Sequence, residues 1–406
     1  TRSIESRREE LARAVSREVG KPIAEARGEV GRCEVILRYY AGEAVRAIGE
    51  VIPAQSGRML QYTLREPVGV VGLITPWNFP AAIPMWKAAP ALAFGNAVVL
   101  KPAEVASGVA VLLAETAETA GLPAGVFNIV LGKGSVVGEA LLHAPGLGAV
   151  SFTGSRSAGA RVAEICAGRN LRFQTEMGGK NVVIVLPDAD LDQAATLTAA
   201  GAMRYAGQKC TATSRAVVAR AVREPSIRKL REQVDALPLG PVDDDAAAIG
   251  PLISAEARSS VMGALAGNGG RALHGGTVPS DARFEHGNYM TPAIVEDVEP
   301  DSKLAQDELF GPVLAILDAP DVDEAISLAN RTEYGLSASL FTRDLGAALD
   351  YVQRIETGLV RVNGDTTGVD PHAPFGGMKA SSSGTREQGP AAREFYTEIK
   401  TVQIAG

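Results

Sequence analysis

The sequence contains few of the residues on which disulfide frameworks, zinc sites and histidine-based catalysis depend. Its 406 residues include three cysteines and four histidines. The cysteines lie far apart without a C-x-x-C pair, which argues against a disulfide framework and against a structural zinc site. The histidines do not cluster, so a Cys–His protease arrangement has little support. We expect no metal site, and this cysteine usage suits a reducing compartment such as the cytoplasm.

Long apolar runs and an excess of positive charge are also missing. No apolar run reaches the ~18 residues that a membrane-spanning helix needs, and no segment resembles a signal peptide. The formal net charge is −7, which gives no general basis for binding nucleic acid or anionic membranes. The first residues already have the pattern of a charged helix and include no initiating methionine, so we expect the natural N-terminus to lie upstream.

The chain is long enough for two or three domains, and much of it alternates between short apolar strands and helices. Such alternation is typical of α/β domains with parallel sheets and right-handed crossovers. One block begins at residue 68 and a second at residue 178. The predicted strands are 68–74, 97–101, 126–131, 149–152, 181–186, 335–341 and 358–363, and the predicted helices between them include 84–94, 107–120, 190–205 and 345–355.

Three other regions have a different character. Residues 3–47 have the pattern of two helices broken at Gly20–Pro22, and residues 48–66 that of a hairpin outside the core. Residues 220–275 are polar and poorly patterned, and we predict that they lie on the surface.

Cys210 lies among small and polar residues, just after a predicted helix. Gly207 removes a side chain near the sulfur, which would let a substrate approach. Lys209 adds positive charge beside the thiol, and nearby cations favour thiolate over thiol. The alternative is a small buried hydrophobe, the usual fate of a free cysteine. The segment alone leaves these two interpretations equally open.

Glycines and hydroxyls follow two of the predicted strands. Gly132, Gly134 and Gly138 form a pattern that follows a strand and opens a helix, which is the context of a phosphate site at a helix N-terminus. Thr153, Gly154 and Ser155 offer hydroxyls and free N–H groups to a second phosphate. Ordinary turns, which glycine and serine also form, are the alternative for both stretches.

Lys101 ends a predicted strand, and Glu104 follows it three residues later. Because ligands bind along the carboxyl edge of open parallel sheets, this pair is a candidate for gripping ribose hydroxyls. A helix that simply begins at Glu104 is the alternative.

Two more polar residues are candidates for chemistry. Asn78 lies between Pro76 and Pro80, which stiffen its loop, and a fixed amide is a good donor to a developing oxyanion. Glu176 precedes two glycines where the two blocks join, and it would supply a general base to a cysteine nucleophile without any histidine. A plain turn residue and a surface carboxylate are the respective alternatives.

Seven motifs taken together resemble the aldehyde dehydrogenase superfamily, in its order and spacing, from about residue 5 to the end of the chain. This resemblance favours the nucleophile interpretation of Cys210. The motifs are Ile74–Pro80 (ITPWNFP), Gly95–Glu104 (GNAVVLKPAE), Phe152–Ser155 (FTGS), Glu176–Lys180 (EMGGK), Gly207–Cys210 (GQKC), Glu308–Pro312 (ELFGP) and Pro374–Lys379 (PFGGMK).

The resemblance implies oxidation of an aldehyde to a carboxylic acid with NAD(P)⁺. Cys210 would attack the aldehyde carbon while Asn78 and the Cys210 N–H hold the oxyanion. Hydride transfer to the nicotinamide would leave a thioester, which water activated by Glu176 would hydrolyse. Lys87 and Glu387 match positions that the family often uses to relay protons.

The resemblance also implies a set of cofactor contacts. Lys101 and Glu104 match contacts to the adenosine ribose, Ser155 a contact to the pyrophosphate, and Glu308 a contact to the nicotinamide ribose. Because the Glu104 carboxylate would repel a 2′-phosphate, we expect NAD, with NADP possible because Lys101 softens the preference. The further expected contacts are Ile74, Thr75, Pro76, Trp77, Gly134, Gly138, Phe152, Thr153, Gly154, Met177, Gly178 and Phe310.

The family's architecture implies a Rossmann-like cofactor domain at residues 1–47 and 67–177 and an α/β catalytic domain at 178–395. Residues 48–66 and 396–406 match its oligomerisation element. We therefore expect a homodimer or a homotetramer. Family members usually begin earlier, and the stretch after Arg220 is shorter than usual.

The segments 363–374 and 381–389 look like the branch that oxidises α-ketoglutaric semialdehyde. Arg204 is similar to the carboxylate-binding arginine of succinic semialdehyde dehydrogenases, and an arginine fork suits a substrate carboxylate. Trp86 stands where those enzymes carry a second arginine, so aromatic and aliphatic aldehydes also stay open. Phe79 and Phe375 complete the expected substrate contacts. A surface ion pair at a helix end is the alternative for Arg204.

Three other function classes remain. A non-catalytic binding or structural relative is disfavoured by the presence of Cys210, Glu176 and Asn78. A CoA-acylating dehydrogenase would not need Glu176 as a base. A thiol hydrolase without a cofactor would form no NADH with any aldehyde.

Overall fold

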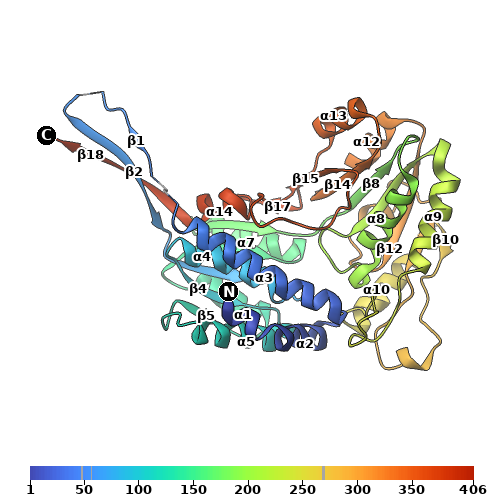
Figure 1. The fold of residues 1–406 in the computed structure, drawn as a ribbon, viewed down its shortest axis with the longest axis horizontal. Coiled ribbons are helices and arrows are strands. Elements are labelled where there is room, and N and C mark those ends of the chain that lie inside the picture. The colour runs from blue at the N-terminus through green and yellow to red at the C-terminus, as the bar shows by residue number, and fades with distance from the viewer. Residues whose placement is uncertain (47–48, 56, 268–269) are drawn as a thin grey trace.

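A computed structural model describes residues 1–46, 49–55, 57–267 and 270–406. It has two α/β bodies, each built around its own sheet, and a narrow three-stranded sheet that projects from the first body (Figure 1). The two parallel sheets predicted from the strand–helix alternation are confirmed.

The first body contains a six-stranded sheet of order β17-β7-β6-β3-β4-β5. The chain steps outward from β3 to β4 and β5, then returns to the other side of β3 with β6 and β7, so the sheet has a topological switch point between β3 and β6. All neighbours are parallel except β17, which pairs antiparallel with β7. The strands are β3 (Val70–Ile74), β4 (Ala97–Lys101), β5 (Phe127–Ile129), β6 (Leu147–Thr153), β7 (Arg172–Glu176) and β17 (Ser382–Ser383).

Helices from the start of the chain pack on this sheet and form its largest core. Val71, Leu73, Val98 and Leu100, from the two central strands, are buried against them. The break predicted at Gly20–Pro22 separates the two long N-terminal helices. The helices of this body are α1 (Arg2–Ser6), α2 (Arg8–Val19), α3 (Ile23–Glu43), α4 (Ala82–Ala93), α5 (Ser107–Thr119), α6 (Glu139–His143), α7 (Arg156–Gly168) and α14 (Gly389–Tyr396).

The second body contains a seven-stranded sheet of order β10-β11-β12-β9-β8-β14-β15, parallel except for β10. Alternate residues of β8 enter different cores. Val183 and Val185 are buried with α8 and α9, and Val182 and Ile184 with α12 and α13. The elements are β8 (Asn181–Val185), α8 (Leu191–Met203), β9 (Thr213–Ala219), α9 (Arg223–Asp235), α10 (Ala255–Ala266), β10 (Arg271–His274), β11 (Ala293–Glu296), α11 (Lys303–Gln306), β12 (Val313–Ala319), α12 (Val322–Asn330), β14 (Ser337–Phe341), α13 (Leu345–Arg354) and β15 (Leu359–Val362).

The prediction that residues 220–275 lie on the surface was wrong. This segment contains α9, α10 and β10, and it buries Ile227, Leu230, Val234 and Val261 in the core of the second body. The apolar positions of α9 are separated by charged residues that face solvent, so the segment looks polar although one face of the helix is buried.

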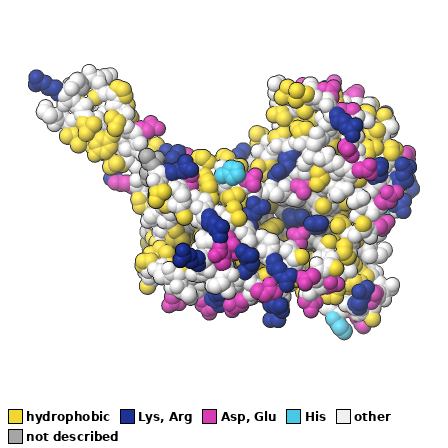
Figure 2. Space-filling model, viewed as in Figure 1, with side chains coloured by type: hydrophobic (Ala, Val, Ile, Leu, Met, Phe, Trp, Pro, Cys, Tyr) yellow, Lys and Arg dark blue, Asp and Glu magenta, His cyan; other side chains and the backbone are white. Residues whose placement is uncertain are grey.

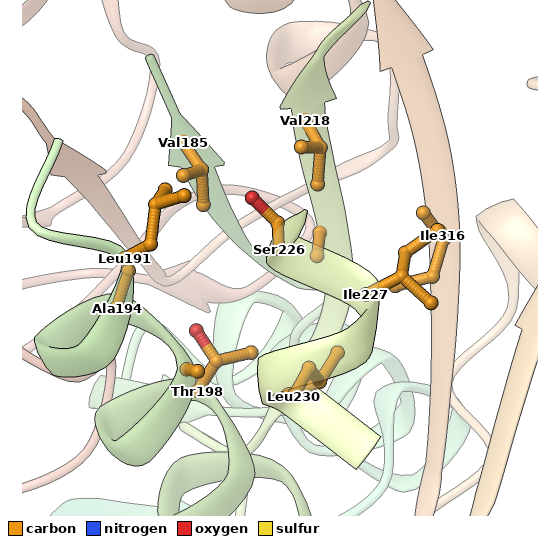
Figure 3. Close-up of a pocket in the computed structure, with 11 residues that line it drawn as sticks. Val185, Leu191, Ala194, Thr198, Val218, Ser226, Ile227, Leu230 and Ile316 are labelled. Carbon is orange, nitrogen blue, oxygen red and sulfur yellow. The ribbon is translucent and has the colours of Figure 1, made fainter. Parts of the chain in front are cut away.

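A cavity of about 20 Å³ lies between α8, α9 and the sheet of the second body (Figure 3). Its wall is apolar except for the hydroxyls of Thr198 and Ser226, both buried and without a hydrogen-bond partner among the described residues. This volume holds about one water molecule, which would satisfy both hydroxyls. The cavity is too small for a substrate and lies apart from every predicted site residue.

The projecting sheet confirms the hairpin predicted at residues 48–66, although Ile48 and Ser56 lie outside the described residues. It contains β1 (Val51–Ile52), β2 (Met59–Pro67) and β18 (Thr397–Ala405) in the order β1-β2-β18. All nine residues of β18 pair antiparallel with β2, so the C-terminal segment and the hairpin form one unit.

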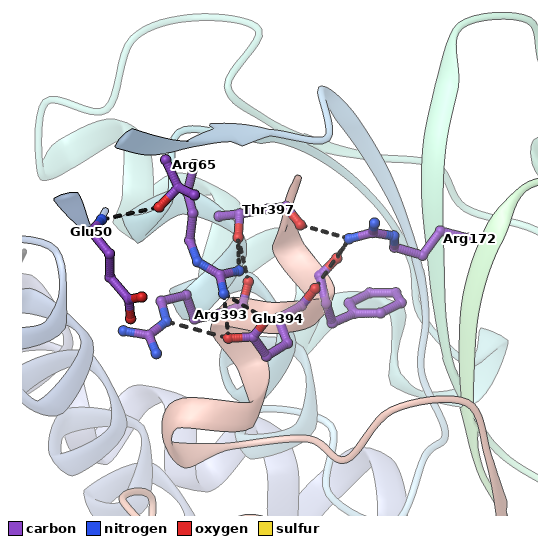
Figure 4. A network of polar contacts seen from close by, with 8 residues as sticks. Glu50, Arg65, Arg172, Arg393, Glu394 and Thr397 are labelled. Carbon is purple, nitrogen blue, oxygen red and sulfur yellow. Dashed lines mark hydrogen bonds and ion pairs between the residues drawn. The ribbon is translucent and has the colours of Figure 1, made fainter. Parts of the chain in front are cut away.

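Arginines anchor the base of this projecting sheet (Figure 4). Arg65 forms an ion pair with Glu394 at 2.7 Å and donates to the hydroxyl of Thr397 at 3.0 Å. Arg172, on β7, donates to the carbonyls of Glu394, Phe395 and Thr397 at 2.7–3.1 Å. These bonds satisfy carbonyls at the end of α14 and fix the direction in which β18 leaves the body.

In the described part of the chain, no helix has both the length and the apolar character required to cross a membrane.

Candidate active site

A cavity of about 340 Å³ has walls from both bodies. The predicted nucleophile Cys210, the predicted base Glu176 and the predicted relay residue Glu387 all line it. The three predicted aromatic contacts line it as well: Phe79, Trp86 and Phe375. Trp86 and Phe375 pack edge to face with ring centroids 5.2 Å apart. The indole N–H of Trp86 is buried without a partner among the described residues.

A strained segment leads from α8 to Cys210. Tyr205 and Ala206 have φ of 56° and 51°, a left-handed conformation that costs energy for residues other than glycine, and Gly207 has φ of 66°. A Cβ on Gly207 would lie 2.3 Å from the carbonyl oxygen of Gly311. The structure therefore gives a reason for this glycine other than the predicted access of substrate to the sulfur: the cysteine loop packs directly on the loop that contains Gly311.

The environment of Cys210 favours the thiol, contrary to the prediction from Lys209. Burial, together with the nearby carboxylates of Glu308 and Glu176, raises the pKa of Cys210 to about 12. Burial also lowers the pKa of Lys209, which opposes a positive charge beside the thiol. Attack by Cys210 therefore requires a base that takes its proton.

Asn78 is buried, and its side-chain amide is fixed against the cysteine loop. Its Nδ2 donates to the carbonyl of Gln208 at 3.0 Å, two residues before Cys210. An amide nitrogen carries two hydrogens, so one stays available for an oxyanion. On the other side of the loop, Asn181 donates to the carbonyl of Cys210 at 2.7 Å and to that of Ala212 at 2.9 Å.

Glu176 ends β7 and is almost completely buried. Its Oε2 accepts a hydrogen bond of 2.6 Å from the hydroxyl of Ser382, and its Oε1 has no partner among the described residues. Burial raises the pKa of Glu176 well above its usual value and the charge of Glu387 adds to this, whereas Ser382 and Lys87 lower it. A raised pKa makes this carboxylate a stronger base, as the predicted role requires.

Lys87 and Glu387 form a buried ion pair, as expected of two residues in one proton relay. The hydroxyl of Ser151 lies 2.8 Å from Lys87 Nζ and 3.0 Å from Glu387 Oε1. Gln174 donates to both Ser151, at 2.9 Å, and Glu387, at 3.3 Å. Sequence reasoning missed Ser151, Gln174 and Ser382, because nothing in their local sequence distinguishes them from ordinary strand residues.

Many of the predicted cofactor residues, among them Thr75, Lys101 and Thr153, lie at the carboxyl ends of β3, β4 and β6, beside the switch point. Two hydroxyls there, those of Thr75 and Thr153, are buried without a partner among the described residues and can bond to a ligand. Ser155 is exposed at the N-cap of the 13-residue helix α7. The helix dipole favours an anion at this end, so the position fits a pyrophosphate.

The contacts expected for the adenosine and nicotinamide riboses lie in separate places. Lys101 is buried, its Cδ lies 3.9 Å from a Cβ position on Gly138, and Glu104 beside it is exposed. Across the site, Glu308 accepts a hydrogen bond of 3.1 Å from Gly179 N, and burial raises its pKa to about 7.

The predicted cofactor glycines differ in how closely their surroundings pack against them. A Cβ on Gly178 would lie 2.0 Å from Glu308 Oε2, so a larger residue there would displace the Glu308 carboxylate. Trp77 and Phe310 pack edge to face at 5.6 Å. Gly134 is different, because it is exposed and a Cβ there would meet no atom within 4 Å. The donors and close approaches elsewhere at this edge fit a dinucleotide.

Arg204 lies at the rim rather than in the wall of the cavity. Its side chain is 52% exposed, and its Nη1 lies 4.0 Å from Glu25 Oε1. This geometry matches the surface ion pair that the sequence left open as the alternative. Glu25 itself lines the cavity, so Arg204 lies close to its mouth.

The chain is similar to known proteins over almost its whole length. Residues 1–402 match the family model described as "Aldehyde dehydrogenase family". The chain is 45% identical over 404 residues to the alpha-ketoglutaric semialdehyde dehydrogenase of Bacillus subtilis, covering 99% of this chain and 83% of the relative. It is 43% identical over 403 residues to the alpha-ketoglutarate semialdehyde dehydrogenase of Haloferax volcanii, covering 98% and 83%.

The chain is also similar to a solved structure, in both fold and sequence. The crystal structure of an NAD-dependent aldehyde dehydrogenase from Sinorhizobium meliloti superposes with a TM-score of 0.96 at 40% identity, covering 99% of this chain and 80% of that one.

We predict that Ser382→Ala moves the acid limb of the pH–activity profile upward by about one unit. Glu176 must be ionised to act as a base, so activity rises with pH through its pKa. The lost hydrogen bond stabilises the carboxylate by roughly 1.5 kcal/mol, about one pKa unit. Steady-state rates between pH 5 and 10 measure the shift.

Ser383→Ala is the matched control, because that hydroxyl contacts Thr175 rather than Glu176. An unchanged limb in Ser382→Ala would refute the role of this bond.

Proposed function

The chain belongs to the aldehyde dehydrogenase family, and we propose that Cys210 is the residue that attacks the aldehyde. The family reaction oxidises an aldehyde to a carboxylic acid with NAD(P)⁺. The observation that supports Cys210 most directly is that one cavity is lined by Cys210, Glu176 and Glu387 together. Because Cys210 must stay reduced to act, the reaction suits the reducing compartment expected from the sequence.

The first step is attack of the Cys210 sulfur on the carbonyl carbon, with loss of the thiol proton. Its raised pKa means that this proton must be taken by a nearby base, and Glu176 lines the same cavity. The carbonyl oxygen gains the negative charge, and Asn78 Nδ2 and the Cys210 N–H are its donors. The nicotinamide cofactor, when bound, accepts the hydride.

The second step is hydrolysis of the acyl group, which Cys210 then carries as a thioester. Glu176 removes a proton from water, the hydroxide oxygen bonds to the acyl carbon, and the carbon–sulfur bond breaks to release the acid. Before this step Glu176 passes on the proton that it took from the thiol, and we propose Glu387 as the acceptor, because Glu387 lines the same cavity and shares buried hydrogen bonds with Ser151 and Lys87. The proton that Glu176 then takes from water goes to the leaving Cys210 sulfur. A base placed in this way also argues against CoA as the acyl acceptor and against a cofactor-free hydrolase.

The substrate that we propose is an acidic semialdehyde such as α-ketoglutaric semialdehyde. The two relatives named above carry that name, and a cavity of about 340 Å³ suits a small molecule of this size. Arg204 places a positive charge near the mouth. The aromatic wall formed by Phe79, Trp86 and Phe375 favours a second candidate, an uncharged aromatic or aliphatic aldehyde.

We predict that the enzyme prefers the acidic substrate. Initial rates of NADH formation should give a kcat/KM for α-ketoglutaric semialdehyde at least tenfold above those for pentanal and benzaldehyde, a difference of about 1.4 kcal/mol. Cys210→Ala should form no NADH with any of them. A wild-type preference for pentanal or benzaldehyde would favour the second candidate, and activity in Cys210→Ala would exclude Cys210 as the nucleophile.

The proposed cofactor is NAD, with NADP used less well. Glu104 is exposed next to Lys101 at the end of β4, where the adenosine ribose is expected. A carboxylate accepts from a 2′-hydroxyl and repels a 2′-phosphate.

We predict that Glu104→Gln raises kcat/KM for NADP relative to NAD by roughly tenfold, because it removes a like charge that costs at least ~1.4 kcal/mol. Steady-state kinetics with each cofactor at saturating aldehyde measure this ratio. Glu118→Gln, which changes an exposed glutamate at the far end of α5, should leave the ratio unchanged. The same ratio in Glu104→Gln and wild type would contradict the proposed contact.

We also propose that residues 1–47 and 67–177 bind the cofactor and residues 178–395 supply the nucleophile. Two details differ from the predicted boundary. The strand β17, at residues 382–383, joins the cofactor-domain sheet, and the helix α14, at residues 389–396, packs in the core of the first body. The projecting sheet at 48–66 and 396–406 is proposed to join two copies of the chain.

Two apolar surfaces support this assembly (Figure 2). Leu60, Leu64, Ile399 and Ile404 are exposed on the projecting sheet, where one edge of β18 has no neighbouring strand among the described residues. The second body exposes Leu345, Leu349, Val352 and Val362 on α13 and the edge strand β15. A two-fold dimer would bury both surfaces of each copy.

We predict a homodimer or a homotetramer in solution. Light scattering coupled to size-exclusion chromatography should give two or four times the mass of the chain. Ile399→Glu, which puts a charge on the exposed face of the projecting sheet, should shift the population toward monomer. Val278→Glu is the matched control, because Val278 is an exposed valine outside both surfaces. A monomeric wild type would exclude the proposal.

A further inference from the structure

We propose that Arg32 is the residue that holds the carboxylate at the far end of the acidic substrate, an inference that rests on the substrate class proposed above. No motif in the sequence pointed to this residue. Three observations support it. Arg32 lines the cavity, no carboxylate of the described residues pairs with it, and the carboxylates nearby are already paired with other groups.

The helix α3 forms one wall of the cavity that contains Cys210. Four of its residues line that cavity, Glu25, Gly28, Glu29 and Arg32, spaced as one face of a helix. Arg32 therefore faces the same space as the nucleophile, from a helix that is fixed in the core of the first body.

Arg32 differs from the other arginines of α3 in its partners. Arg27 forms ion pairs with Glu9 and Asp245, and Arg38 forms one with Glu5. Arg32 Nη1 donates to the carbonyl of Val369, and no carboxylate of the described residues lies within 4.0 Å of its guanidinium. The edge formed by Nε and Nη2 remains free for a bidentate contact with a carboxylate.

The hydrogen bond to Val369 also fixes Arg32 against the loop that contains Gly368 and Val369. Val369 and Gly368 both line the cavity, and the carbonyl of Gly368 accepts from Arg361. The guanidinium of Arg32 is thus held between α3 and this loop. A group fixed in advance loses less conformational entropy when it binds a ligand.

The carboxylates near Arg32 already have partners of their own. Glu29 forms a buried ion pair with Lys21, and its Oε1 accepts from the N–H groups of Ala81 and Ala82, at 2.8 and 2.9 Å, where α4 begins. Glu387 is paired with Lys87. A substrate carboxylate therefore does not compete with either of these for Arg32.

The other cations near the cavity are less suitable. Burial lowers the pKa of Lys209, which opposes an ammonium charge beside Cys210. The Arg204 side chain is 52% exposed at the rim, so water screens its charge. The Glu25 carboxylate beside it offsets part of that charge. An arginine cannot lose its proton in a protein, so Arg32 supplies a lasting charge inside the cavity wall.

The test compares Arg32→Met, Arg32→Lys and Arg204→Met with wild type, using α-ketoglutaric semialdehyde and pentanal. Pentanal has the same five-carbon length without the carboxylate. Arg32→Met should lower kcat/KM for the acidic substrate by roughly 10- to 100-fold, mainly through KM, because a charge-assisted contact is lost.

Arg32→Met should leave kcat/KM for pentanal unchanged within about threefold, which also shows that the variant folds. Arg32→Lys should recover part of the loss, and Arg204→Met should lose less than threefold.

Three outcomes would overturn the inference. An equal loss for both substrates in Arg32→Met would show a structural role. A normal acidic-substrate rate in Arg32→Met together with a large loss in Arg204→Met would assign the carboxylate to Arg204, and the proposed substrate class would stand. A wild type that oxidises pentanal better than the acidic substrate would remove the substrate class itself, and the inference with it.

Discussion

The antiparallel pairing of β17 with β7 is the constraint on which the candidate site depends. Ser382 pairs with Glu176 and Ser383 with Thr175, so the C-terminal segment is attached to the end of the strand that carries the proposed base. Phe375 and Glu387 exchange backbone hydrogen bonds of 2.6 and 2.7 Å on either side of this strand. One short strand thus brings an aromatic wall residue, a relay carboxylate and a hydrogen-bond donor to Glu176.

Burial then sets the protonation states of the residues brought together. It raises the pKa of Cys210, Glu176 and Glu308 and lowers that of Lys209, so charges are disfavoured at this site. The buried charges that persist are paired, as in Lys87 with Glu387 and Lys21 with Glu29. Ligands that enter such a site therefore meet few competing charges.

Much of the fold was predictable because periodicity is a local property. The strands β3, β4, β5 and β6 of the first sheet and β8, β14 and β15 of the second were predicted from short apolar runs, and the projecting hairpin from a change of composition. The strands β7, β9, β11 and β12 were not predicted. The α9 region was missed because its buried stripe, Ile227, Leu230 and Val234, is diluted by charged residues on the solvent side. In the site, Phe79, Trp86 and Phe375 were expected beside Cys210 from motifs, and the structure places them in one cavity.

By itself, the sequence determined the family, the two-sheet α/β architecture and the residue types able to act as nucleophile, base and oxyanion donor. These depend on motifs and periodicities that neighbouring residues carry. Only the tertiary structure decided that Gly207 is needed for packing on Gly311 and that Arg32 lines the cavity while Arg204 lies at its rim. It also decided that Ser151 and Gln174 form hydrogen bonds with Glu387, and Ser382 with Glu176. The reason is that hydrogen bonds, burial and the direction of a side chain are set by residues distant in the chain, and no local pattern records them.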